Sequence, residues 1–221
     1  MKKAAYLFWT IGLAHVFFQY THQEVWISFT KPLLMPLLAI FYCQKNSKKI
    51  FLVALLFSWV GDLLLMGEGY LFFLSGILSF WVAQLLYLYF INKEIELPLN
   101  KFFSSKKGLV SLLLFGGYFL GTISLLGSKL GTLTIPVSGY AFTLATIGAV
   151  AMLLWMTKKN TKTFALLAGV VLFILSDSMI AFNTFYFKEN IFGFWVMATY
   201  IPAQFLICNY FINQSAKQHE I

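Results

Sequence analysis

Apolar residues in this chain gather in eight long stretches, which short polar breaks separate. An α-helix rises ~1.5 Å per residue, so roughly 20 apolar residues cross the hydrocarbon layer of a bilayer. We therefore predict eight transmembrane helices, at residues 4–20, 26–42, 50–66, 70–91, 108–126, 133–156, 163–185 and 192–212. None of the breaks is long enough for a soluble domain. We expect a single all-α integral membrane domain over residues 1–221.

The composition agrees with a membrane protein. Hydrophobic residues make up 60% of the chain and charged residues 11%, and the mean hydropathy is +0.79. Soluble domains carry roughly a quarter charged residues, and a chain of this length has too little interior to hide so much apolar surface. Met1-Lys2-Lys3 precedes the first stretch without a small-residue cleavage site after it, so we expect a retained helix rather than a signal peptide.

Sixteen lysines and no arginine produce the net charge of +8, and their positions predict the orientation. Thirteen lie at the two termini and in the second, fourth and sixth loops, whereas only Lys129 and Lys188 lie in the other loops. Because cytoplasmic loops collect basic residues, we expect an even number of spans with both termini in the cytoplasm. The basic charge is thus a topology signal, and no nucleic-acid partner is expected.

The two halves of the chain contain similar pairs of residues. Gly61-Asp62 in the third span matches Ser176-Asp177 in the seventh, and Ala83-Gln84 in the fourth matches Ala203-Gln204 in the eighth. An offset of four spans preserves direction, which suggests a parallel 4+4 internal repeat like those of some transporter folds. Chance similarity between apolar helices is the alternative.

The only two aspartates, Asp62 and Asp177, lie inside predicted spans. At ~1.5 Å per residue, these carboxyl groups, Lys31 and Tyr200 fall roughly 17 to 22 Å from the cytoplasmic boundary, and His15 reaches a similar level. An ionisable group inside a membrane costs roughly 2.5–3.5 kcal/mol on insertion scales. Such a group usually faces the protein interior and has a partner or a function.

Three functions are compatible with this polar layer. In an enzyme, two neighbouring carboxyl groups can differ in protonation and act as acid and base. In a proton-coupled transporter or lipid carrier, Asp62 and Asp177 carry protons. In a structural protein, Lys31 and one aspartate form a buried ion pair that holds helices together.

Other polar residues in the spans are weaker candidates. Tyr140, Tyr200 and Gln204 either bind a head group or bond between helices, and for Asn183 and His15 a packing role is favoured. The prolines of the spans are expected to kink helices and free carbonyl groups near the polar layer: Pro32, Pro36, Pro136 and Pro202.

No metal or cofactor is expected. Cys43 and Cys208 are far apart in the chain and lack metal-site spacing, so we interpret them as packing residues. The chain has no phosphate-binding glycine loop, nucleophile elbow or H-E-x-x-H motif.

The chain contains, in this order, Lys31-Pro32, Gly61-Asp62-Leu63-Leu64-Leu65-Met66, Ser176-Asp177-Ser178 and Tyr200-Ile201-Pro202-Ala203-Gln204. Together with the stretch that ends at Asn183, these segments resemble the YhhN-like family of transmembrane lysoplasmalogenases over nearly the whole chain. Eight spans also agree with that family. The chain differs from the family pattern at Gln84, where histidine is frequent, and a glutamine cannot transfer protons as imidazole can.

The resemblance implies hydrolysis of the vinyl ether bond of a lysoplasmalogen, which releases a fatty aldehyde and glycerophosphoethanolamine or glycerophosphocholine. It implies Asp62 and Asp177 as the catalytic pair, one as acid and one as base. Residues expected to line the same substrate pocket are Lys31, Gln84, Tyr140, Asn183, Tyr200 and Gln204. The expected partners are membrane lipids and a lysophospholipid that enters from the bilayer, and the expected location is a bacterial inner membrane. The sequence does not specify an oligomeric state.

Overall fold

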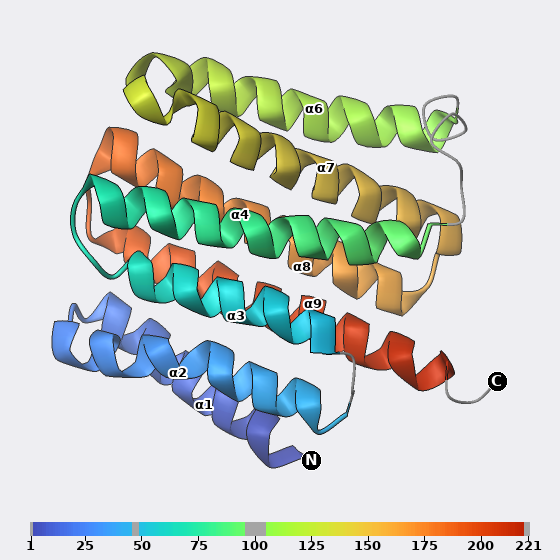
Figure 1. Ribbon diagram of the computed structural model, residues 1–221, viewed down its shortest axis with the longest axis horizontal. Helices are drawn as coiled ribbons and strands as arrows, with labels where there is room; N and C mark the ends of the chain where they lie inside the picture. Colours follow the sequence, from blue (N-terminus) through green and yellow to red (C-terminus); the bar gives the residue numbers. More distant parts are fainter. Residues whose placement is uncertain (1, 46–48, 96–104, 219–221) are drawn as a thin grey trace.

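Long helices run side by side in the computed structural model, which describes residues 2–45, 49–95 and 105–218 (Figure 1). Within those residues every regular element is helical and no strand occurs. The eight α-helices are α1 (Lys2–Tyr20), α2 (Glu24–Cys43), α3 (Lys49–Leu64), α4 (Tyr70–Lys93), α6 (Lys106–Leu126), α7 (Thr134–Lys158), α8 (Thr161–Phe182) and α9 (Ile191–Gln218). Short 3-10 turns η1 (Gly127–Lys129) and η2 (Gly131–Leu133) join α6 to α7, and the π-helical turn η3 (Asn183–Phe187) follows α8. The predicted spans therefore coincide with the helices to within a few residues.

Polar residues in the breaks begin and end several helices. Ser105 accepts a hydrogen bond from the Gly108 N–H at 2.9 Å before α6, and Asn160 accepts one from the Thr163 N–H at 2.9 Å before α8. These side chains satisfy N–H groups that have no partner in the first turn. Lys159 ends α7 in the left-handed conformation, with φ at 46°. The chain thus reverses within a few residues, and successive helices pack antiparallel.

Prolines free carbonyl groups where α2 approaches α3. Pro36 has no N–H to donate to the carbonyl of Pro32, and the indole N–H of Trp59 on α3 donates to that oxygen at 2.8 Å. Pro202 likewise lies inside α9. The prediction that Pro136 kinks a span was wrong, because Pro136 is the third residue of α7, where no helical N–H partner is lost.

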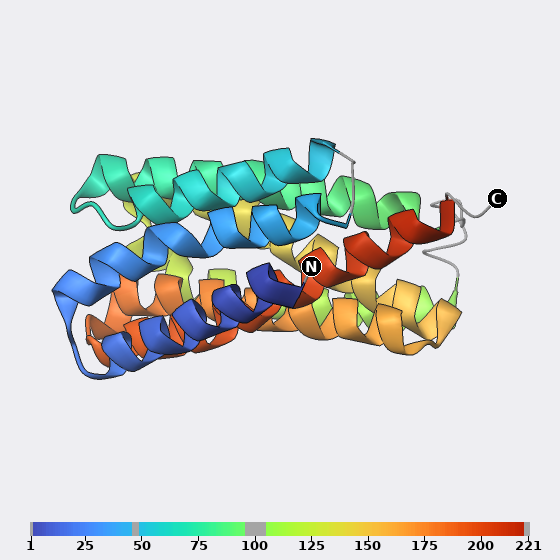
Figure 2. The same cartoon turned by 90° about the horizontal axis from the view of Figure 1, so that it is seen from below.

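Two layers of helices form the centre of the bundle. α3 and α4 lie in one layer, and α8 and α9 lie in the other, as the two views agree (Figures 1 and 2). The α1–α2 pair packs at one side against α9, and the α6–α7 pair packs at the other side through contacts of α7 with α4 and α8. The helix pairs α1–α2 and α3–α4 of the first half thus have counterparts in the pairs α6–α7 and α8–α9 of the second half. The internal repeat itself stays a prediction.

The helices alternate in direction along the bundle. α1, α3, α6 and α8 run one way, and α2, α4, α7 and α9 run the other way (Figure 1). The beginning of α1 and the end of α9 therefore lie at the same end of the bundle. Which compartment that end faces stays a prediction, and two of the lysines used for it, Lys48 and Lys101, lie outside the described residues.

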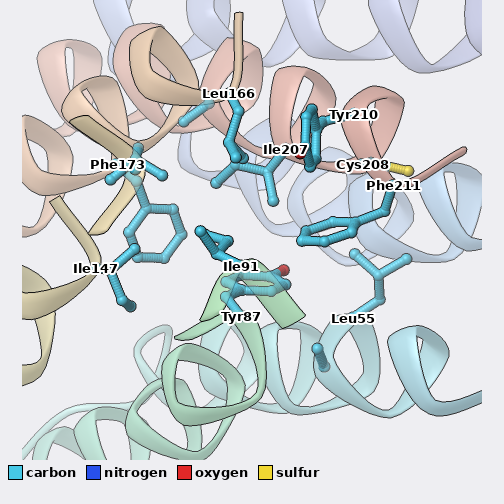
Figure 3. Packing of buried hydrophobic residues seen from close by; sticks show 14 of the residues in the cluster. Leu55, Tyr87, Ile91, Ile147, Leu166, Phe173, Ile207, Cys208, Tyr210 and Phe211 are labelled. Carbon is cyan, nitrogen blue, oxygen red and sulfur yellow. The ribbon is translucent and has the colours of Figure 1, made fainter. Parts of the chain in front are cut away.

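Apolar side chains fill the interior and also cover the surface. Side chains from α3, α4, α7, α8 and α9 meet in the core that Figure 3 shows around Tyr87 and Phe173. On the outside, Leu71 is 72% exposed and Ile135 83% exposed, and many other leucine, valine and phenylalanine side chains are exposed as well. A surface so apolar suits lipid rather than water.

Among the described residues, six helices are long and apolar enough to cross a membrane: α2, α4, α6, α7, α8 and α9. α3 is apolar over Ile50–Leu64 but shorter, and α1 does not belong to the six. The protein is thus a multi-pass membrane protein with an all-helical fold. The count of eight spans stays a prediction for α1 and α3.

Candidate functional site

Asp62 lies near the end of α3 and is only 3% exposed. The phenol O–H of Tyr200 on α9 donates to Oδ2 of Asp62 at 2.9 Å. Gly61 lets α4 approach at this level, because a Cβ atom there would lie 2.5 Å from the ring of Phe80. The depth estimate from the sequence had put Asp62 and Tyr200 in one layer, and the structure brings them into contact.

A buried hydrogen-bond network holds Tyr200 in this position. Gln204, one turn later on α9, donates through Nε2 to the Tyr200 hydroxyl at 3.2 Å and to the Ser58 hydroxyl at 3.3 Å. Tyr87 on α4 donates to Oε1 of Gln204 at 2.9 Å. We call this set, with Asp62 at its end, the Asp62 network. Protein groups occupy both ends of the Gln204 amide, so Gln204 positions Tyr200.

Lys31 does not form a contact ion pair with either aspartate. Its charge acts on Asp62 and on His15, but among the described residues the ion pair within 4.0 Å joins Lys158 and Glu94 instead. Lys31 is therefore an electrostatic neighbour of Asp62 and not a direct partner.

His15 is fully buried in α1 and belongs to the packing of the first two helices. Its Nδ1 lies 2.7 Å from the hydroxyl of Thr30 on α2, and its Nε2 lies 3.5 Å from Gln19. This is the hydrogen-bonded packing role that the sequence favoured.

Asp177 lies on α8, is 8% exposed and receives two hydrogen bonds on the same oxygen. The hydroxyl of Tyr140 on α7 and the amide Nε2 of Gln84 on α4, the latter at 3.1 Å, both donate to Oδ2. Among the described residues no donor lies within hydrogen-bond distance of Oδ1. We call these three residues the Asp177 cluster. It leaves one carboxyl oxygen available to a further molecule.

Asp177 and Tyr140 lie at the wall of a cavity with an empty volume of about 580 Å³. The space that is wide enough for water holds only a few molecules, since one needs ~10–15 Å³. Tyr118 and Ser178, whose hydroxyl oxygens are 2.9 Å apart, add polar groups to the wall. Apart from Thr122 on α6, the rest of the lining is apolar. It comes from the turn after α3 and from α4, α6, α7, α8 and η3: Leu65, Phe73, Ile77, Phe80, Leu126, Val137, Ala141, Leu144, Ile180, Ala181 and Phe185.

Aromatic rings pack between the Asp62 network and the Asp177 cluster. The ring of Tyr200 lies 6.0 Å from that of Phe80 and 5.9 Å from that of Phe173, measured between centroids. A charge on either carboxyl group acts on the other across this region. The two carboxyl groups are thus electrostatic neighbours with separate hydrogen-bond partners.

The residues singled out in the sequence divide into two groups. Asp62, Asp177, Gln84, Tyr140, Tyr200 and Gln204 form the two connected sets just described, with Lys31 close to the first. Asn183 does not join them, since its Oδ1 accepts the Glu189 N–H at 2.8 Å and closes the turn before α9. Of the residues predicted to line the substrate pocket, Tyr140 lines this cavity. The others are absent from its lining: Lys31, Gln84, Asn183, Tyr200 and Gln204.

Sequence reasoning missed Ser58, Tyr87, Tyr118 and Ser178. Tyr87 carries a signal that could have been used, because it follows Gln84 by three positions and therefore shares its helix face. The contact of Tyr118 with Ser178 joins residues 60 positions apart on helices that are not neighbours in sequence, and no local pattern indicates it. In the described parts of the chain, no three His, Cys, Asp or Glu side chains are grouped so that they could hold a metal ion.

Fold and site together define a class: an all-helical, multi-pass membrane protein with two buried carboxyl groups and a mostly apolar cavity that reaches one of them. The YhhN family model matches residues 26–210, and the chain belongs to the YhhN family. The match includes both aspartates and all of their hydrogen-bond partners. No solved structure matches the chain.

Proposed function

We propose that the protein is a membrane hydrolase that cleaves the vinyl ether bond of lysoplasmalogens. The products are a fatty aldehyde and glycerophosphoethanolamine or glycerophosphocholine. Membership of the YhhN family supports a membrane enzyme. The observation that carries the proposal is Asp177 at the wall of a mostly apolar cavity. Two donors hold one oxygen of its carboxyl group, and the other oxygen has no donor among the described residues.

Vinyl ether hydrolysis needs an acid and a base, and Asp177 can serve as both in turn. Its protonated carboxyl group, with the proton on Oδ1, transfers that proton to the alkenyl carbon β to the ether oxygen, and an oxocarbenium ion forms. Water adds to the carbon that bears the oxygen and gives its proton back to Asp177. This proton regenerates the carboxyl group. The resulting hemiacetal then separates into the aldehyde and the glycerol hydroxyl.

Tyr140 and Gln84 assist the first step. When Asp177 gives up its proton it becomes a carboxylate, and both donors already point at Oδ2. Hydrogen bonds that become charge-assisted in the transition state stabilise it more than they stabilise the ground state. The roles proposed for these residues are therefore positioning and charge stabilisation.

Asp62 acts from a distance in this mechanism. A carboxylate there, fixed by Tyr200, places negative charge near the positive oxocarbenium ion. The π faces of neighbouring rings such as Phe80, which lines the cavity, also attract a cation. Asp62 is thus the electrostatic partner of the pair and Asp177 the group that reacts with substrate.

The lining of the cavity suits the alkenyl chain of a lipid. A chain that enters from the bilayer replaces lipid contacts with contacts to leucine, isoleucine, valine and phenylalanine side chains. Because the cavity is narrow, a single-chain lysolipid fits this arrangement better than a two-chain lipid.

The reaction is tested with purified protein in detergent and a vinyl ether lysolipid, by measuring aldehyde release. Asp177→Asn should reduce the rate by at least about 100-fold, the usual contribution of an acid-base group. Glu94→Gln, which removes a carboxylate from the exposed ion pair with Lys158, is the matched control and should keep the wild-type rate. Equal rates for wild type and Asp177→Asn would reject the catalytic role.

Transport is the competing function, and sealed vesicles separate it from hydrolysis. Uptake of the intact lysolipid that depends on a proton gradient, without aldehyde, would identify a proton-coupled carrier. Aldehyde release that is unchanged when the gradient is collapsed supports the hydrolase.

The proposed location is a bacterial inner membrane, crossed eight times, with both termini in the cytoplasm. Lysines at the ends of α4 and α7, such as Lys93 and Lys158, lie at the end of the bundle assigned to the cytoplasm. A reporter that is active only outside the cytoplasm, fused after Ile221, should be inactive. An active reporter would reverse the orientation.

A further inference from the structure

A groove lies between α2 and α3, which pack side by side (Figures 1 and 2). Its empty volume is about 1000 Å³, against about 580 Å³ for the cavity at Asp177, and much more of it is wide enough for a water molecule. Binding sites for small ligands measure ~300–1,000 Å³. The groove is therefore large enough to hold a hydrocarbon chain.

Each wall of the groove is one face of a helix. Pro36 and Ile40 on α2 are four positions apart, and Leu52, Leu56 and Trp59 on α3 follow at helical spacing. Ile40 is 50% exposed and Leu56 52% exposed, so the groove opens to the outside of the bundle. Because α2 is long and apolar enough to cross the membrane, this opening faces lipid. A hydrocarbon chain fills such a groove better than water, which would hydrate its apolar walls.

The two ends of the groove differ in polarity. At one end, the indole N–H of Trp59 donates to the Pro32 carbonyl at 2.8 Å and bridges the two helices. At the other end, Cys43 and Gln44 complete the lining on α2. Gln44 follows Met35 by nine positions, so the groove extends along about 13 Å of helix.

Positive charge gathers at the end of the groove where α2 ends and α3 begins. Residues 43–50 contain Lys45, Lys48 and Lys49 and no acidic residue. Lys49 is the first residue of α3 and precedes Leu52 by three positions, so it belongs to the helix face that lines the groove. Lysines beside the end of a membrane helix attract anionic lipid head groups. The charge of this segment thus complements a negative head group above an apolar groove.

We propose that the groove binds a phospholipid with a net negative charge. One acyl chain lies between α2 and α3 and ends near Trp59, and the phosphate lies at the segment that contains Lys45 and Lys49. The site is separate from the cavity at Asp177, since the two linings share no residue. It holds whatever reaction the protein catalyses.

Trp59 allows a direct test, because bromine atoms on an acyl chain quench the fluorescence of a tryptophan that they contact. The protein is reconstituted in phosphatidylcholine vesicles that contain a minor fraction of acyl-brominated phosphatidylglycerol or, in a parallel sample, acyl-brominated phosphatidylcholine. The Trp59 signal is the difference between wild type and Trp59→Phe. Phosphatidylglycerol should quench this signal at a mole fraction at least about fivefold lower, the usual contribution of one lysine near a membrane surface. The other tryptophans, measured in Trp59→Phe, should show little preference.

Two kinds of variant separate the charge from the groove. Lys45→Gln combined with Lys49→Gln should remove the preference for phosphatidylglycerol and leave quenching by phosphatidylcholine unchanged. Lys106→Gln combined with Lys107→Gln removes the same charge from exposed positions at the start of α6, so this matched control should keep the preference. Ala39→Leu adds a side chain to the wall and should reduce quenching by both lipids.

Equal quenching of Trp59 by the two lipids would overturn the proposal, because any chain of the bilayer would then fill the groove without regard to charge. No quenching by either lipid would overturn it as well, since the groove would be closed to lipid. An equal loss of preference in the two double-lysine variants would assign the preference to the overall surface charge and reject a site at this groove.

Native mass spectrometry of the wild-type protein gives a second measurement that needs no variant. From an equal mixture in detergent, phosphatidylglycerol should be retained in preference to phosphatidylcholine, and equal retention would reject the site. Neither experiment measures aldehyde release, so the lipid site and the proposed reaction can fail separately.

Discussion

Replacing Tyr140 by Phe removes one hydroxyl group from the wall of the cavity and leaves the ring in place. The lost hydrogen bond ends on the Asp177 carboxyl group. A hydrogen bond to a charged group contributes about 1.5–3 kcal/mol, and each 1.36 kcal/mol of transition-state energy changes a rate tenfold. Because Asp177 becomes a carboxylate as it gives up its proton, we expect kcat/KM for vinyl ether hydrolysis to fall about 10- to 100-fold.

Tyr118→Phe is the matched control, since Tyr118 lines the same cavity but bonds to Ser178 at 2.9 Å. A neutral hydrogen bond contributes about 0.5–1.5 kcal/mol, so this change should cost at most about tenfold. The assay is the initial rate of aldehyde release at substrate concentrations below KM, with circular dichroism to confirm that both variants are folded. A loss of rate in Tyr118→Phe as large as in Tyr140→Phe would refute the reasoning, because the effect would then follow from the cavity and not from Asp177.

Three further changes test the structure. Asn183→Ala removes the acceptor of the Glu189 N–H, so the melting temperature should fall by about 2–4 °C while kcat/KM stays unchanged; a selective loss of activity would instead place Asn183 in the substrate pocket. Gly61→Ala pushes a Cβ into a ring of α4 and should destabilise the protein by about 1–3 kcal/mol, whereas Gly116→Ala, with open space around it, should not. Lys31→Gln and Asp62→Asn should each lower the free energy of unfolding. The loss in the double variant should be smaller than the sum of the two single losses, by under ~4 kcal/mol for charges more than 4 Å apart; strict additivity would show that the two charges are not linked.

The helices follow from the sequence because each needs only its own residues. Apolar stretches of about 20 residues have to satisfy their backbone groups within the segment once they lie in lipid, and a helix does this. The predicted boundaries lie within a few residues of most helix ends because the polar breaks between apolar stretches contain the capping residues, such as Ser105 and Asn160, which act within three residues. Pro136 was misjudged by the same kind of reasoning. Its effect depends on its distance from the start of α7, which the apolar pattern did not define closely enough.

The candidate site was predicted in part. Asp62, Asp177, Lys31 and Tyr200 could be placed at one depth because helical rise is nearly constant. Depth says nothing about rotation around the helix axis or about which helices are neighbours. For this reason the sequence grouped Gln204 and Asn183 with the substrate pocket, while the structure uses the first to position Tyr200 and the second to close a turn.

The sequence by itself determined that the protein is helical and that it lies in a membrane, because these properties depend on local composition. From the rise per residue it also predicted that the two aspartates share a level. The tertiary structure decided the partners. Packing of α7 against α4 and α8 puts Gln84 and Tyr140 on one oxygen of Asp177, and a hydrogen bond from α9 to α3 joins Tyr200 to Asp62. It also decided that Asp177 lines the cavity. Such contacts join residues up to 138 positions apart, and only the arrangement of whole helices can specify them.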